Sequence, residues 1–178
     1  RVRLVVREIT VELEVQGRDL EVRQVQYSGD GVAAHSVTRI DGDLERPAVL
    51  ESAGIGEAAA AKFARLGATV VIVARRADLL DKVAARITHS GGDAIARPCD
   101  LSDMDAIDKL VTDVEAELGG VDILINNAGR SIRRPLAESL DRWHDVERTM
   151  TLNYYSPLRL IRGFAPGMIE RGDGHIIN

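Results

Sequence analysis

Four short stretches of this sequence carry residues suited to binding phosphate groups and nucleosides. Gly54 and Gly56 lie where a helical pattern starts, and glycines at a loop-to-helix junction let backbone N–H groups approach an anion closely. The other three stretches are Arg75 with Arg76, Asp100 with Leu101, and residues 126–129. Together they predict contact with a ligand that combines phosphates with nucleosides.

The pattern around these stretches alternates between strands and helices from Pro47 onward. Apolar runs predict buried strands at 48–50, 69–73 and 121–125, the first of them short. Apolar positions with a helical repeat predict helices at 57–66, 77–89, 103–118 and 139–168. Strands joined by helices pair in parallel through right-handed crossovers. The sequence therefore predicts an incomplete, doubly wound parallel α/β sheet (Rossmann-like), with all four stretches at strand carboxyl ends, where such sheets bind ligands.

One proline disturbs this pattern. Pro157 falls inside the last predicted helix, where its ring removes a backbone hydrogen bond and clashes with the preceding turn. The sequence therefore predicts a kink in that helix between Tyr155 and Pro157.

Residues 1–46 follow a different pattern from the rest of the chain. Apolar and polar residues alternate over 9–16, which predicts a strand with one solvated face. A turn and a second strand at 20–27 would complete a β-hairpin. We expect a small β-rich appendage or a poorly ordered segment over 1–46, without chemistry of its own, and the N-terminal part of a ligand-binding domain over 47–178.

The composition excludes several classes of partner and site. The net charge of −5 leaves no excess of basic residues to bind nucleic-acid phosphates. No apolar run approaches the roughly 18 residues of a membrane span, so no transmembrane segment is expected. The single cysteine, Cys99, excludes an internal disulfide and is typical of a reducing compartment, which predicts a cytoplasmic location. The four histidines are scattered and predict no metal site.

The end of the second strand is the position that distinguishes two dinucleotides. An acidic residue there binds the ribose 2′-OH of NAD, whereas a nearby arginine accommodates the 2′-phosphate of NADP. This position is Ala74, and Arg75 and Arg76 follow it. Charge therefore favours NADP(H) as the cofactor, with the alternative that either arginine is a solvated surface residue.

In their order and spacing, four motifs resemble the short-chain dehydrogenase/reductase family over about residues 49–178: Gly54 to Gly56, Cys99 to Leu101, residues 126–129, and Leu152 with Asn153. The resemblance implies that the cofactor-binding residues are Ser52, Gly54, Ile55, Gly56, Arg75, Arg76, Asp100, Leu101, Asn127, Ala128 and Gly129. By the same resemblance, Asp100 and Leu101 flank the adenine, and residues 127–129 line the ribose on the nicotinamide side. Asn153 matches the catalytic asparagine, which in the family holds a water in the proton relay.

A narrower resemblance covers residues 126–134 and 138–154, which look like the corresponding part of the fatty acyl-CoA reductases of this family. Those enzymes use NADPH to reduce long-chain acyl-CoA to fatty aldehyde, which implies hydride transfer to a carbonyl and a small-molecule or acyl-CoA substrate. The family also implies a homo-oligomer when full length, packed through 103–118 and 139–168, with the alternative that the apolar residues of these helices pack against their own sheet instead. Three arginines just past a strand end could pair with CoA phosphates, or instead with carboxylates of neighbouring helices: Arg130, Arg133 and Arg134.

The sequence departs from the family pattern at both ends. Val49 and Leu50 stand where the family's glycine motif begins, and one hypothesis is that residues 1–51 come from a fused domain or a shifted reading frame. In the family, the catalytic serine comes a few residues after the strand in which this sequence ends. The family's Tyr-x-x-x-Lys helix is also missing, because neither Tyr154 nor Tyr155 has a lysine four residues on. Together with the apolar run at the end of the chain, this predicts a C-terminally truncated fragment that has no reductase activity by itself.

Two alternatives to an acyl-CoA reductase stay open from the sequence. One is a member of the same family that acts on another carbonyl or alcohol, such as a sterol, a sugar or a ketoacyl thioester, because the family's specificity loops lie mostly beyond residue 178. The other is a non-catalytic nucleotide-binding module, because the glycine loop lacks its usual start. A Tyr-x-x-x-Lys motif in downstream sequence would favour an enzyme.

Overall fold

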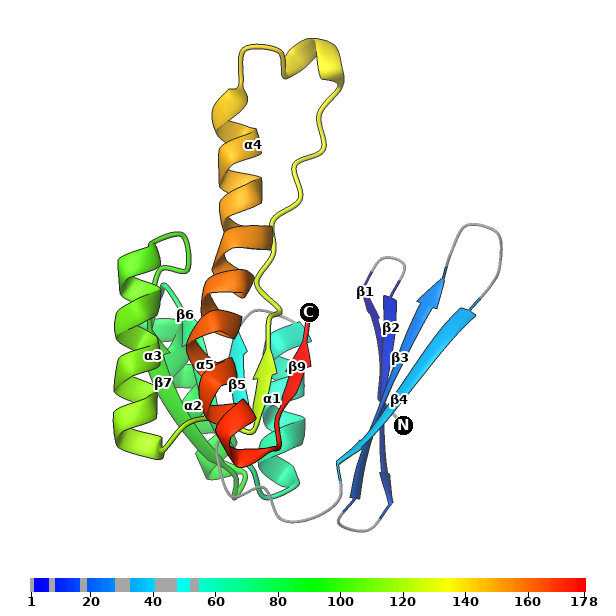
Figure 1. Cartoon of the computed structure of the whole chain (residues 1–178), viewed down its shortest axis with the longest axis vertical. Coiled ribbons are helices and arrows are strands. Elements are labelled where there is room, and N and C mark those ends of the chain that lie inside the picture. Colours follow the sequence, from blue (N-terminus) through cyan, green and yellow to red (C-terminus); the bar gives the residue numbers. More distant parts are fainter. Residues whose placement is uncertain (1, 7–8, 17–18, 28–32, 41–47, 52–54) are drawn as a thin grey trace. The chain divides into compact units, whose positions relative to one another are not determined.

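The chain divides into two compact units, Arg1–Asp43 and Leu44–Asn178. They are seen in a computed structural model that describes residues 2–6, 9–16, 19–27, 33–40, 48–51 and 55–178. The first unit is an antiparallel sheet, and the second is a parallel sheet with helices (Figure 1).

The first unit has four strands in the order β1-β2-β3-β4. They are β1 (Val2–Val6), β2 (Ile9–Gln16), β3 (Asp19–Tyr27) and β4 (Ala33–Ile40). β2 and β3 form the hairpin that the sequence predicts, with Ile9 opposite Gln26 and Gln16 opposite Asp19. The sequence did not predict the two further strands, β1 and β4, which extend this hairpin at both edges. Neither edge strand has a sustained apolar–polar alternation, so its pairing depends on its neighbour more than on local pattern.

The second unit is a five-stranded parallel sheet in the order β7-β6-β5-β8-β9. Its strands are β5 (Ala48–Glu51), β6 (Thr69–Ala74), β7 (Asp93–Pro98), β8 (Ile123–Ile125) and β9 (His175–Ile177). Its helices are α1 (Ile55–Arg65), α2 (Ala77–His89), α3 (Met104–Leu118), α4 (Trp143–Met150) and α5 (Ser156–Arg171), with the short turns η1 (Leu136–Glu138) and η2 (Thr151–Tyr155). The first strand of the unit is central, and the predicted doubly wound α/β sheet is confirmed.

Alternate residues of β6 are buried in two different helical layers. Val71 and Val73 belong to the apolar cluster that α3 and α5 form with the sheet, which includes Phe164. Val70 and Ile72 are fully buried on the opposite face of the pleat, where α1 and α2 pack (Figure 1). Helices therefore cover both faces and leave the carboxyl ends of the strands as an open edge.

The segment 139–168, predicted as one kinked helix, contains α4, η2 and most of α5 in unbroken succession. Figure 1 shows them as one continuous rod that projects beyond the sheet. The helix continues without a break from Tyr155 to Pro157, and the place predicted for a kink is where η2 ends and α5 begins. The irregularity is instead the π-helical turn η2, in which the Ser156 N–H donates to Thr151 O, five residues back. A proline at the start of α5 has no N–H to place in the α-helical ladder.

Candidate functional site

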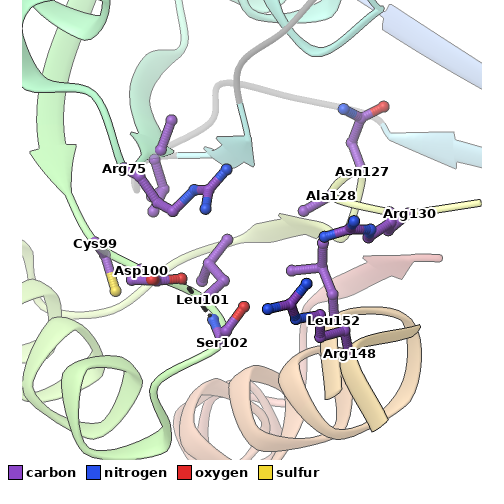
Figure 2. A pocket seen from close by; sticks show the side chains of 13 residues that line it. Arg75, Cys99, Asp100, Leu101, Ser102, Asn127, Ala128, Arg130, Arg148 and Leu152 are labelled. Atoms are coloured by element: carbon purple, nitrogen blue, oxygen red, sulfur yellow. Dashed lines mark hydrogen bonds between the residues drawn. The ribbon is translucent and has the colours of Figure 1, made fainter. Parts of the chain in front are cut away.

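A cleft of about 700 Å³ lies at the carboxyl ends of β6, β7 and β8. Its walls are the ends of these strands, the turn before α3 and one side of the α4–η2 rod (Figure 2). In an open parallel α/β sheet this edge is where ligands bind. The residues that line the cleft are Val73, Ala74, Arg75, Cys99, Asp100, Leu101, Ser102, Asn127, Ala128, Gly129, Arg130, Arg148 and Leu152.

The wall between β7 and α3 is a turn fixed by its own hydrogen bonds. The Asp100 carboxylate accepts a hydrogen bond from the Ser102 backbone N–H at 2.9 Å (Figure 2). The Asp103 carboxylate caps α3 by accepting from two N–H groups of its first turn, at 3.0 and 3.2 Å. Because both carboxylates are tied to backbone groups, the turn presents Leu101 to the cleft in a set position.

The strip of chain that follows β8, from Asn126 to Arg130, forms a second wall of the cleft. The side chain of Asn153 holds this strip in place. Asn153 Oδ1 accepts from the Arg130 N–H at 2.7 Å, and Asn153 Nδ2 donates to Arg130 O at 2.8 Å. Nearer to β8, the Asn126 N–H donates to Ile177 O at 2.8 Å, which ties the strip to β9. The reciprocal pair leaves the Asn153 amide one N–H and one oxygen lone pair for a further partner, such as the water that the family resemblance implies.

The helical wall is attached to the β7–α3 turn through a buried serine. Ser156 is 1% exposed, and its hydroxyl contacts the Leu101 carbonyl oxygen and lies 2.8 Å from Thr151 O. This contact fixes the start of α5 against the turn. Leu152 and Arg148 precede Ser156 on the same rod at intervals of four residues, and both line the cleft.

Among the residues whose side chains the structure describes, the cleft lining carries more positive than negative charge. Three of these lining residues are arginines, Arg75, Arg130 and Arg148, and one is a carboxylate, Asp100, although the net charge of the whole chain is −5. Within the described part of the chain, no carboxylate forms an ion pair with these three guanidinium groups. Guanidinium groups without such partners favour an anionic ligand.

Arg134 is the exception among the arginines considered for CoA phosphates. Its Nη1 lies 3.1 Å from Asp145 Oδ2, which also accepts from Arg142 Nε at 2.9 Å. The alternative, pairing with a carboxylate of a neighbouring helix, is therefore the observed one for this residue. Arg133 is exposed and does not line the cleft.

Two further features are absent from the described residues, a metal site and a membrane-spanning helix. No group of three or more His, Cys, Asp or Glu side chains is arranged there to hold a metal ion. Nor does that part of the chain contain a helix with the length and apolar character needed to cross a membrane.

Residues 51–178 match the model of the family described as short chain dehydrogenase. The chain belongs to the short-chain dehydrogenase family. This confirms the family that the four motifs indicate, and it agrees with the doubly wound sheet. The match begins at the last residue of β5, so the antiparallel unit lies outside it.

Two curated relatives of this short-chain dehydrogenase carry the name fatty acyl-CoA reductase. The protein Rv0547c of Mycobacterium tuberculosis is 75% identical over 127 residues, and that of Acinetobacter baylyi is 52% identical over 127 residues. Each match covers 71% of this chain and 43% of the relative. The chain thus spans less than half the length of these relatives.

Two similar solved structures share the fold and contain a bound cofactor. A metagenomic short-chain oxidoreductase in complex with NADP is 38% identical, with a TM-score of 0.72 over 76% of this chain and 62% of its own. L-Sorbose reductase from Gluconobacter frateurii, complexed with NADPH and L-sorbose, is 34% identical, with a TM-score of 0.68 over 74% of this chain and 50% of its own.

The structure brings most of the predicted cofactor-binding residues of this short-chain dehydrogenase into one place. Arg76 is an exception, because it is exposed at the position before α2 and does not line the cleft. Gly56 is buried in the first turn of α1, and Asn153 reaches the cleft wall through the strip after β8. The predicted cofactor-binding residues that line the cleft are Arg75, Asp100, Leu101, Asn127, Ala128 and Gly129. Outside the residues whose side chains the structure describes lie Ser52, Gly54 and Ile55.

Sequence reasoning missed Arg148 as a cleft residue. It lies in α4, four residues before Leu152 and five before Asn153. The spacing of four to Leu152 is a weak signal for it, because Leu152 lies in the π-helical turn η2, which also sets the direction of Arg148. The narrower resemblance includes Arg148 without giving it a role. Ser102 was also missed, and its contribution to the site is the backbone N–H that Asp100 accepts.

Proposed function

We propose that this chain is the cofactor-binding part of an NADP(H)-dependent oxidoreductase that transfers hydride to a carbonyl carbon. The observation that carries the proposal is the cleft at the strand carboxyl ends with three arginines in its walls. The residues fit such a cofactor, because Leu101 and Leu152 offer apolar surface for an adenine beside cations for phosphates. When bound, the cofactor supplies the hydride, and the protein binds and orients it.

Arg75 is the residue we assign to the 2′-phosphate of NADP(H). It follows β6 directly, lines the cleft and has no carboxylate partner among the described residues. The preceding residue is Ala74 rather than the acidic residue that would bind the 2′-OH of NAD. The complex of the similar metagenomic oxidoreductase with NADP supports the same choice. Arg76 is a weaker candidate because it lies outside the cleft walls.

The substrate we propose is a long-chain fatty acyl-CoA. The relatives at 75% and 52% identity are named fatty acyl-CoA reductases. Hydride adds to the thioester carbonyl carbon, the C–S bond then breaks, and the CoA thiolate takes up a proton as the aldehyde is released. Arg130 in the cleft wall and exposed Arg133 remain available for CoA phosphates, whereas Arg134 pairs with Asp145.

Asn153 is proposed as the asparagine that holds a water of the proton relay. Its amide keeps one N–H and one lone pair after bonding to the Arg130 backbone. The same bonds make it a positioning residue for the strip over 127–129. The tyrosine and lysine of the family's relay have no counterpart in this sequence, so we expect the chain alone to bind cofactor without turning over.

The proposal also includes a cytoplasmic location and self-association of the full-length protein. The single Cys99 supports a reducing compartment. Large apolar side chains are exposed on the α4–α5 rod, with Trp143 at 70% and Tyr154 at 54%, and a second copy packed on the rod would bury them. Light scattering on the full-length protein tests this, because a monomeric mass would contradict it.

The test of the cofactor assignment is a fluorescence titration of the purified chain with NADPH and NADH. We expect NADPH to bind more tightly, and Arg75→Ala to remove that preference by weakening NADPH about tenfold or more. Arg65→Ala, an exposed arginine of α1 outside the cleft, is the matched control and should change neither affinity. Equal affinities in the unaltered chain would contradict NADP(H), and no binding of either nucleotide would contradict the cofactor-binding role.

An activity assay on the full-length protein distinguishes this proposal from two alternative functions. The similarity to L-sorbose reductase supports a family member that acts on another carbonyl or alcohol, and a non-catalytic nucleotide-binding module is the second alternative. NADPH oxidation by the full-length protein with acyl-CoA, but not with sugars or sterols, would support the acyl-CoA reductase. Activity with the other substrates alone, or binding without any turnover, would favour the first or the second alternative.

A further inference from the structure

Arg148 faces the cleft from the side opposite Arg75. Figure 2 shows the Arg148 side chain reaching from the helical wall toward Leu101 and Ser102, while Arg75 enters from the end of β6. Arg148 is exposed and, within the described residues, forms no ion pair with a carboxylate. The cleft thus has a guanidinium group on each side of the Asp100–Leu101 turn.

The acidic residue nearest to Arg148 on its own helical face is already occupied. Asp145 Oδ2 accepts from Arg134 at 3.1 Å and from Arg142 at 2.9 Å, and Oδ1 lies 3.3 Å from His144 Nε2. Asp145 is almost fully buried with these partners. Arg148 is therefore the cation of α4 that is left facing the cleft instead of joining this cluster.

The direction of Arg148 depends on the π-helical turn that separates α4 from α5. Ser156 fixes the start of α5 against the Leu101 carbonyl, and η2 follows α4 without a break. Each residue of a helix turns it by about 100°, so removing the extra residue of a π turn would rotate α4 by about that angle relative to α5. Arg148 would then face away from the cleft. The turn thus sets both the position of Asn153 and the direction of Arg148.

We propose that Arg148 contacts the adenine of the bound dinucleotide by stacking its guanidinium group on the ring. This inference rests on the proposed cofactor-binding function and adds a residue to it. Leu101 and Leu152 offer apolar surface beside Arg148, which suits a flat ring, and guanidinium groups stack readily on aromatic faces. The neighbouring Asp100 carboxylate would repel a phosphate at this place but can accept a hydrogen bond from the amino group of adenine.

An adenine contact predicts results that contacts with the 2′-phosphate or with the diphosphate do not. Arg148→Ala should weaken NADPH and NADH by the same factor, about three- to tenfold, because both carry adenine. Arg75→Ala should weaken NADPH alone. Adenosine, which has the adenine ring and no phosphate, should bind Arg148→Ala more weakly by a similar factor, whereas nicotinamide mononucleotide, which has no adenine, should bind it unchanged. Arg162→Ala, an exposed arginine of α5 away from the cleft, is the matched control and should leave all four ligands unchanged.

Calorimetric or fluorescence titration of the purified chain measures these affinities, and a thermal melt checks that each variant is folded. If Arg148→Ala does not fold, Arg148→Lys replaces it, because lysine keeps the charge but lacks the planar face. We then expect the affinities for NADPH and NADH to fall by equal but smaller factors. Loss confined to NADPH would make Arg148 a ligand of the 2′-phosphate, and loss for both dinucleotides with adenosine unchanged would make it a ligand of the diphosphate. Either result would overturn the adenine assignment, and unchanged affinities would overturn any contact. Failure of the unaltered chain to bind any of the four ligands would instead contradict the proposed function itself.

Discussion

The two ends of the α4–α5 rod are held in place by different interactions. α5 buries Leu160, Phe164 and Met168 against the sheet, at successive intervals of four residues. The one buried residue of α4 is Asp145, and Trp143 at its start is 70% exposed. Apolar contact therefore fixes α5, whereas a carboxylate and its cationic partners fix α4.

The junction between α4, held by ionic contacts, and α5, held by apolar contacts, lies at the candidate site. η2 joins the two helices and carries Leu152 and Asn153, and Arg148 precedes it. The cleft residues of the rod thus come from the part that contributes little to the core. We expect changes in α5 to act on global unfolding, and changes in α4 to act on local order and on ligand binding.

The largest effect is expected from Phe164→Ala in α5. Phe164 is 1% exposed, and truncating a buried phenylalanine costs about 3–5 kcal/mol of unfolding free energy, because transfer and cavity costs add. Urea unfolding measures it. Ile169→Ala, on the same helix but 78% exposed, is the control and should cost about 0.5 kcal/mol or less. A Phe164→Ala loss no larger than the control would contradict the apolar anchoring of α5.

Asp145→Ala should affect α4 with little change in α5. The substitution leaves Arg134 and Arg142 without their shared acceptor, at a cost of about 1–3 kcal/mol for hydrogen bonds to a charged group. Hydrogen exchange should speed up at the amides of α4 and not at those of α5. Asp141→Ala, exposed in the preceding turn, is the control. Exchange that is unchanged in α4 would show that this cluster does not hold the helix.

Gly163→Ala tests how closely α5 packs on α3. A Cβ at Gly163 would lie 2.7 and 2.8 Å from the two methyl groups of Val111, whose β-branched side chain strongly prefers one χ1 rotamer in a helix. Overpacking of about 1–3 kcal/mol should exceed the gain of about 1 kcal/mol from removing a helical glycine. Adding Val111→Ala should recover part of the overpacking cost in a double-mutant cycle. A single variant more stable than the unaltered chain would contradict the close packing.

The smallest effect is expected from Asp108→Asn on the outer surface of α3. The hydrogen bond and charge of Arg159 lower the pKa of the Asp108 carboxyl below its ordinary value of 3.8. A carboxyl whose pKa is lower in the folded chain stabilises it above that ordinary value, and this contribution is lost as the pH falls through the lowered value. Because the pair is exposed, the stability difference between variant and unaltered chain should be small at pH 7 and vanish in acid. A difference that grows on acidification would contradict the pairing.

The sequence predicted the regular helices of the second unit well and the rod poorly. α2 and α3 match their predicted ranges because strong apolar stripes and clear end signals, such as the Asp103 cap, act locally. The rod was predicted as one helix with a kink. Pro157 signals an irregularity at this place, but the sequence did not predict that it takes the form of a π turn. The contact of Ser156 with the Leu101 carbonyl beside that turn joins residues 55 positions apart, and no local pattern reports such a contact.

The candidate site was predictable where topology alone sets it. Arg75, Asp100 and Asn127 follow strands, and parallel strands bring their carboxyl ends to one edge of the sheet, so the sequence placed these residues together. Arg148 was not predicted, because it enters from a helix and its direction depends on the phase that η2 introduces. The pairing of Arg134 with Asp145 was foreseen only as one of two alternatives, because the sequence does not show which carboxylate folds beside it.

The binding of a dinucleotide at the strand carboxyl ends is tested most directly by mapping backbone amide shifts in the NMR spectrum of the purified chain on addition of NADPH. We predict that the shifted amides gather at positions 74–75, 100–102 and 127–130 and on the cleft side of η2. Shifts confined to the antiparallel unit, spread evenly over the chain, or absent at saturating NADPH would contradict a cofactor site in this cleft.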